Sequence, residues 1–255
     1  MLKEIILLTG QAAQQIALSS LLKEHNPQLS FRYTVEAGDL QALDPDSLRH
    51  SRLLAFTSGV IVPARILNAL GHGAYNFHPG PPEYPGWAPA HFALYDGAAT
   101  FGATAHRMAE RVDSGPIIGI ESFPIPENIG VRELEQVAFI RLAYLFWRLS
   151  KALATQGEPI KSLPIHWSGT KSTRQMYISM CDIPADISKA ELELRIRAFN
   201  DDFRAIYPTV TVHGIQFRVT AATVTASATT LPDESSGQTR LQAASDAPSI
   251  AMIPA

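Results

Sequence analysis

Short apolar runs alternate with helical patterns through the first third of the chain. Three runs have the length and composition of strands, at residues 4–10, 30–36 and 52–59. Between the first two, one helical face carries Ala13, Ile16, Ala17 and Leu21. Strands separated by helical segments need crossover connections, so the pattern predicts a Rossmann-like, mostly parallel sheet flanked by helices.

The middle of the chain adds three strands and two helices to this plan. Strands are predicted at 73–77, 101–109 and within 110–123, and a short helix at 88–97. The alternation in the second of these strands puts Thr104, His106 and Met108 on one side. The longest helix is predicted at 131–152, with the apolar stripe Leu134, Val137, Ala138, Leu142, Leu145 and Leu149.

The composition changes near residue 155. Residues 155–177 are polar and irregular and predict a connector that wraps back over the domain. Ser188 and Glu191 form a capping box for a helix that runs to about Phe203, and 207–220 predicts a hairpin turning near His213 and Gly214. We therefore predict three parts: an α/β domain (1–155), a small helix–hairpin appendage (156–220) and a disordered tail (221–255). The exposed hairpin edge offers a surface for a homodimer.

Composition narrows the classes of function. The 255 residues are 46% hydrophobic with a formal net charge of −3, which argues against nucleic-acid partners and anionic membranes. The N-terminal apolar run is short and carries Lys3 and Glu4, so it predicts a buried strand rather than a signal peptide. Cys181 is the single cysteine, which excludes an intrachain disulfide. We expect a cytoplasmic protein with no membrane segment.

The segment YNFHPGPPEYPG, residues 75–86, carries the first candidate chemistry. Asn76 and His78 lie on the same side at the carboxyl end of a strand, where open α/β sheets bind ligands. A histidine can relay a proton and an asparagine amide can donate to an oxyanion, although a loop cap and a structural histidine would look the same. Asp113, in RVDSGPII, either caps its own turn or orients the ring of His78.

Together these segments resemble a known family. NFHPG…YPG, GWAPAHFALYDG and FGATAHRMAERVDSGPII occur in the order seen in folate-dependent formyltransferases, a resemblance that covers residues 50–150 well and 1–50 loosely. It implies Asn76, His78 and Asp113 as the catalytic trio and 10-formyltetrahydrofolate as the formyl donor. It also implies a pterin pocket formed by Val60, Ile61, Val62, Arg107, Met108, Ala109, Glu110 and Val112.

Two departures from the family pattern concern the acceptor and the pocket. The family's Ser-Leu-Leu-Pro segment after the His-Pro pair is replaced here by Gly80-Pro81-Pro82. A similar loop occurs in the formyltransferase-like domain of the hydrogenase-maturation protein HypX. The N-terminal half is also short by about one strand–helix unit. Neither departure removes a member of the trio.

Other kinds of site have weaker support. His72, His78 and Asp113 have neither the helical spacing nor the Cys-x-x-Cys pattern of a metal centre, so we expect no metal. His106 is interpreted as a core or pocket-lining residue rather than a catalytic one. Cys181 is interpreted as a packed or surface thiol.

The acceptor is the open question. One helix and one hairpin are too little for the C-terminal barrel of methionyl-tRNA formyltransferases, and the charge is negative. The resemblance of the appendage to that of sugar N-formyltransferases favours a small amine, such as a nucleotide-linked amino sugar, with Trp167, Lys171 and Arg174 on the acceptor side. The alternatives are a formyltetrahydrofolate hydrolase, a methionyl-tRNA formyltransferase-like enzyme, and a folate-binding accessory module with impaired catalysis.

Overall fold

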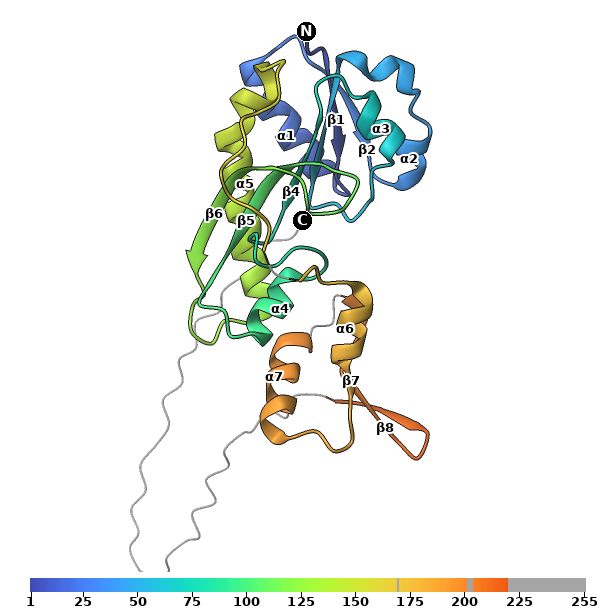
Figure 1. Ribbon diagram of the computed structural model, residues 1–255, viewed down its shortest axis with the longest axis vertical. Helices are drawn as coiled ribbons and strands as arrows, with labels where there is room; N and C mark the ends of the chain where they lie inside the picture. The colour runs from blue at the N-terminus through green and yellow to red at the C-terminus, as the bar shows by residue number, and fades with distance from the viewer. Residues whose placement is uncertain (169, 201–203, 220–255) are drawn as a thin grey trace, which may run out of the picture. The chain divides into compact units, whose positions relative to one another are not determined.

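A six-stranded sheet organises the first half of the chain (Figure 1). The computed structural model describes residues 1–168, 170–200 and 204–219, so the predicted tail at 221–255 lies outside the described residues. The strand order is β2-β1-β3-β4-β5-β6. The strands are β1 (Glu4–Leu8), β2 (Ser30–Thr34), β3 (Ser51–Phe56), β4 (Ala74–His78), β5 (Thr100–Arg107) and β6 (Ile117–Pro124).

The sheet changes direction after β4. The first four strands pair in parallel, whereas β5 runs antiparallel to β4 and β6 antiparallel to β5. The predicted α/β fold with a mostly parallel sheet is therefore confirmed. The reversal brings the chain that leaves β4 through the proline-rich loop back alongside β4, so β4 and β5 contribute side chains to the same surface.

Helices cover both faces of the sheet (Figure 1). They are α1 (Ala12–His25), α2 (Ala37–Gln41), the 3-10 helix η1 (Pro45–His50), α3 (Ala64–Ala69), α4 (Pro89–Tyr95) and α5 (Val131–Thr155). Helices α1 and α5 pack on one face, and α2, η1 and α3 on the other. This gives three layers with an apolar core on each side of the sheet. No described helix combines the length and the apolar character that a bilayer span requires.

The buried face of α1 differs from the predicted one. Leu18 and Leu22 are buried, whereas Ile16 is 66% exposed and Ala13 and Ala17 face solvent. The apolar residues of α1 are spread around the helix, so their periodicity alone does not define which face is buried. Packing against α5 decides the rotation: the ring of His25 lies 2.9 Å from Ser150 Oγ at the C-terminal end of α1.

A buried arginine connects the central sheet to the end of α5. Arg52 lies in β3 and is fully buried. Its guanidinium donates to the carbonyls of Ala152, Leu153 and Gln156 and to that of His72, in the turn before β4. A helix leaves its last carbonyls without intrahelical partners, and a cation there also opposes the negative end of the helix dipole. Burial lowers the pKa of Arg52 from its ordinary value, but the side chain stays charged.

The appendage contains more regular structure than predicted. It comprises α6 (Arg174–Cys181), β7 (Asp182–Ile183), α7 (Lys189–Phe199), β8 (Thr209–Val212) and β9 (Ile215–Arg218). The expectation of an irregular chain to residue 177 is wrong, because Thr173 accepts a hydrogen bond from Met176 N and begins α6. The Ser188 cap is confirmed, since its hydroxyl accepts from Glu191 N.

The hairpin of β8 and β9 is confirmed, with its turn at His213 and Gly214. Strand β7 pairs in parallel with β8 and was not predicted. Helix α7 ends at Phe199, and Phe203 lies outside the described residues. Tyr177 and Phe199 pack against α4, which attaches the appendage to the sheet domain. The boundary near residue 155 stays a prediction.

Candidate active site

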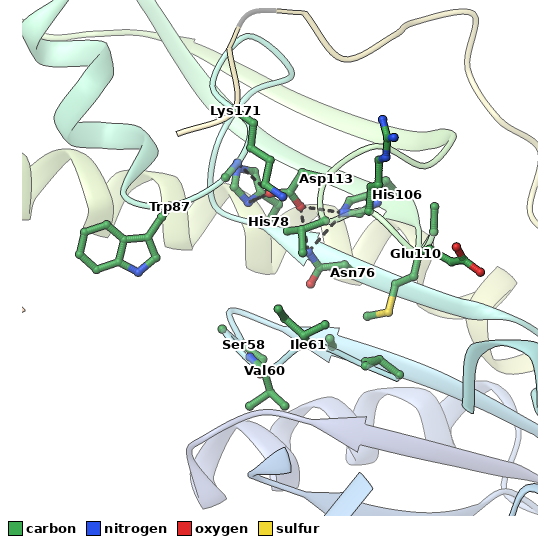
Figure 2. Close-up of a pocket in the computed structure, with 18 of the residues that line it drawn as sticks. Ser58, Val60, Ile61, Asn76, His78, Trp87, His106, Glu110, Asp113 and Lys171 are labelled. Atoms are coloured by element: carbon green, nitrogen blue, oxygen red, sulfur yellow. Dashed lines mark hydrogen bonds and ion pairs between the residues drawn. The ribbon is translucent and has the colours of Figure 1, made fainter. Parts of the chain in front are cut away.

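Two adjacent antiparallel strands supply three polar side chains to one surface. Asn76 and His78 lie two residues apart on β4, and His106 lies opposite Asn76 on β5. Residues directly opposite each other in an antiparallel pair point to the same side of the sheet. Figure 2 shows these side chains meeting beside Asp113, across the cavity from Val60 and Ile61. Both histidines are buried, and Asn76 is partly exposed.

Asp113 is the centre of this cluster. It has a left-handed backbone, with φ 46°, and its carboxylate is turned back onto the strand ends. Oδ1 lies 3.2 Å from His106 Nε2 and 3.5 Å from Asn76 Nδ2. Oδ2 accepts a hydrogen bond of 2.8 Å from Gly86 N and lies 3.5 Å from His78 Nδ1. Each carboxylate oxygen therefore has two polar neighbours.

The pKa values of the cluster follow from burial and from these contacts. Burial opposes ionisation of Asp113, but the hydrogen bond from His106, the charges of both imidazoles and the Gly86 amide outweigh it and lower its pKa to about 2. Burial lowers the pKa of His78, and the His106 charge lowers it further. Asp113 and the Tyr84 carbonyl act in the opposite direction. Asp113 is therefore a permanent anion that orients its neighbours.

The proline-rich loop closes over His78. The His78 ring lies with Nε2 3.2 Å from the Tyr84 carbonyl. Thr104, opposite His78 on β5, donates to the Gly80 carbonyl over 2.8 Å and holds the loop against the sheet. A Cβ atom at Gly80 would lie 2.6 Å from His78 Nε2, so this position accommodates only glycine without movement of the ring. The Gly80-Pro81-Pro82 segment thus packs directly on the predicted catalytic histidine.

The connector between α5 and α6 covers the other side of the cluster. Trp167 donates from Nε1 to the Gly115 carbonyl over 2.9 Å. Its ring meets the His106 and His78 rings edge-on, with centroids 5.0 and 5.8 Å apart. Further along, Ser172 hydrogen-bonds the backbone at Pro85 and Trp87 and fixes the connector beside the loop. The connector thereby shields both imidazoles from water.

A cavity of about 340 Å³ opens beside Asn76, His78, His106 and Asp113. Its walls include all but one of the predicted pterin-pocket residues: Val60, Ile61, Val62, Met108, Ala109, Glu110 and Val112. Arg107 is not among the described lining residues, because it is adjacent to His106 on β5 and points to the opposite face of the sheet.

A second cavity, of about 810 Å³, lies on the other side of the loop that carries Asp113. Trp167 and Lys171 line it, and Lys171 also lines the first cavity, so the two cavities meet beside the cluster. Figure 2 shows Lys171 extending over the cluster. Arg174 is exposed at the start of α6 and is not among the described residues that line either cavity.

The interpretation of His106 as a core or pocket-lining residue is confirmed, since it is buried and lines the first cavity. Its direct contacts with Asp113 and Asn76 were not predicted. The available signal was its register: had β5 been recognised as antiparallel to β4, His106 would have fallen opposite Asn76. Among the described residues, no group of three histidine, cysteine or acidic side chains has the arrangement to hold a metal ion.

Comparison with known proteins identifies the core of this fold. Residues 40–138 match the family model described as formyl transferase. The comparison supports a relationship of this part of the chain to the formyl transferase family. The match contains the trio and most of the first cavity, and it confirms the resemblance in the sequence.

The relatives of the formyl transferase domain differ in their acceptors. Methionyl-tRNA formyltransferase of Listeria welshimeri is 34% identical over 122 residues, 48% of this chain and 37% of that protein. The chain thus spans little more than a third of that relative's length. A sugar N-formyltransferase from a Shewanella species has a similar fold, with a TM-score of 0.71, 16% identity, and coverage of 86% of this chain and 96% of its own. HypX from Aquifex aeolicus gives a TM-score of 0.54 at 16% identity, covering 86% of this chain and 38% of its own.

Proposed function

We propose that the protein transfers a formyl group from 10-formyltetrahydrofolate to a small amine. The observation that carries the proposal is the meeting of Asn76, His78 and Asp113 at the wall of a cavity that all but one of the predicted pterin-pocket residues also line. Two structures with this fold were solved with folinic acid or 5-N-formyl-tetrahydrofolate. The first cavity is the proposed donor site.

The chemistry follows from the residues at the junction of the two cavities. The acceptor amine attacks the formyl carbon, and the carbonyl oxygen becomes an oxyanion that the Asn76 amide and protonated His78 stabilise. The amine loses a proton and the N10 nitrogen of the folate gains one as its bond to the formyl carbon breaks. His78 is the group that relays this proton. Asp113, with its pKa lowered to about 2, holds the other groups in position.

The second cavity is the proposed acceptor site. Arg111, His166 and Lys171 line it, and none of them forms an ion pair with a described residue. Three uncommitted basic side chains favour an anionic ligand, such as a nucleotide-linked amino sugar, and Trp167 supplies an aromatic surface beside them. Arg174 lies away from this cavity, so only Trp167 and Lys171 of the predicted acceptor-side residues enter the proposal.

Incubation with 10-formyltetrahydrofolate and a panel of amines, read by product mass, tests the proposal. We expect a formylated amine from the wild-type protein, and a loss of about 10²–10³-fold in Asn76→Ala and His78→Ala, because each removes a group that stabilises the oxyanion. Gln175→Ala, an exposed change on α6, is the matched control. Release of formate without any amine would identify a hydrolase instead, and donor binding without turnover would identify an accessory module.

A further inference from the structure

His106 is the one buried titratable group at the site that the proposed chemistry does not use. It is 2% exposed and lies in β5. Its Nε2 faces Asp113 Oδ1 at 3.2 Å and Asn76 Nδ2 at 3.2 Å. Its Nδ1 lies 3.0 Å from the carbonyl of Arg107, the next residue. A buried imidazole with a polar group at each nitrogen is held in one orientation.

The two histidines have similar surroundings, except that Nε2 of His106 also faces the Asn76 amide nitrogen. Each ring has a backbone carbonyl at one nitrogen, from Tyr84 for His78 and from Arg107 for His106. Each has an oxygen of Asp113 at the other nitrogen. Four acceptors therefore face the two rings, whereas two neutral imidazoles supply only two N–H donors. One further proton gives a third donor and neutralises the carboxylate charge.

A second added proton would be unfavourable. It would leave the buried cluster with a net positive charge beneath Trp167, and like charges on neighbouring groups oppose each other's ionisation. The titratable groups that face His78 are Asp113, from the loop after β5, and His106, from β5. Lys171 of the connector lines the cavity further out. The charge of His106 therefore opposes a second protonation at His78.

We propose that His106 is a positioning residue that holds Asp113 and the Asn76 amide in place and shares one proton with His78 through the Asp113 carboxylate. The expected change in kcat rests on the proposed formyl transfer, whereas the sharing of the proton between the two histidines does not. Loss of His106 removes a like charge and leaves Asp113 freer to attract the proton, so His78 binds it more tightly. Loss of the hydrogen bond to Asp113 also releases the Asn76 amide from its fixed position.

Two substitutions separate the hydrogen bond from the charge. His106→Gln keeps a neutral N–H donor near the position of Nε2, and His106→Leu removes the donor and the charge. His50→Gln, at an exposed position in η1, is the matched control. Nuclear magnetic resonance titration of labelled histidines follows His78, which is assigned by the disappearance of its signal in His78→Gln. Circular dichroism establishes that each variant is folded.

In the wild type we expect His78 to titrate below its ordinary range, because burial and the charge of His106 lower its pKa, and in both His106 variants we expect it to titrate at higher pH. We expect kcat to fall about tenfold to a hundredfold in His106→Leu, with the KM for the folate within about twofold, and His106→Gln to recover most of it. An unshifted His78 titration in both folded variants overturns the shared proton, and a wild-type kcat in His106→Leu overturns the positioning role. Formyl transfer absent from the wild type would refute the proposed function and leave the titration to decide on the shared proton.

Discussion

Lowering the pH should weaken the junction between the sheet domain and the appendage through His91. This side chain lies in α4 and is fully buried. Its ring centroid lies 5.0 Å from that of Tyr177 and 6.1 Å from that of Phe199, in the apolar cluster that joins the two parts. Burial, with the charge of Arg204, lowers the pKa of His91 to about 3 from the ordinary value of 6.5.

The sign and size of the effect follow from proton linkage. The unfolded chain binds a proton at His91 near pH 6.5 and the folded chain only near pH 3, so acid favours the unfolded state. The contribution to stability is complete above pH 6.5 and declines as the pH falls toward 3. When the pH falls from 7 to 5, protonation of this one residue should lower the free energy of unfolding by about 2 kcal/mol.

Urea unfolding at several pH values between 7 and 5, followed by circular dichroism, measures this slope. We expect His91→Leu to lose about 2 kcal/mol less than the wild type over this range. The comparison uses the slope of the free energy of unfolding against pH for each protein. A packing cost of the leucine that is the same at every pH therefore does not affect the result. Gln175→Leu, an exposed change on α6, should keep the wild-type slope. An unchanged slope in His91→Leu would refute the assignment of the acid sensitivity to this residue.

Two further substitutions test how the fold supports the site. Arg52→Met leaves three carbonyls at the end of α5 without their buried donor, so we expect a loss of about 3 kcal/mol in urea unfolding at pH 7. A loss below about 1 kcal/mol would show that water replaces the guanidinium. Gly80→Ala would place a Cβ 2.6 Å from His78 Nε2, so kcat should fall about a hundredfold, while Gly10→Ala, with no atom within 4 Å, serves as the control. A normal kcat in Gly80→Ala would show that the loop can move away from the ring.

Local rules predicted only where these side chains lie, whereas their interpretation as a catalytic trio came from the resemblance to the family. Alternation puts Asn76 and His78 on one side of β4 whatever the rest of the chain does, and the turn that contains Asp113 follows the neighbouring strand. The direction of β5 was not predictable from its own sequence, since a parallel and an antiparallel strand have the same alternation. The contact of His106 with Asp113 was therefore not predicted, and Arg107 was assigned to a pocket from which the pleat of β5 turns it away.

The same limit explains the errors outside the site. The face of α1 depends on where α5 lies, because apolar residues are spread around the helix. Helix α6 was not predicted, because residues 155–173 are polar and the irregular connector was continued past Thr173. The apolar spacing of Tyr177 and Cys181, both buried, would have revealed one helical face. Arg52 is the first residue of the strand predicted at 52–59, and only the docking of α5 gives it buried partners.

The altered loop and the connector together bear on the choice of acceptor. Gly80 lets the loop pack on His78 from one side, and Trp167 covers the same ring from the other. Access to the cluster is left through the two cavities that meet beside Lys171. If the donor fills the first cavity, the acceptor amine must arrive from the second, past Lys171 and the Asp113 loop. The length of that loop and the path of the connector, more than the trio itself, would then decide which amines reach the formyl carbon.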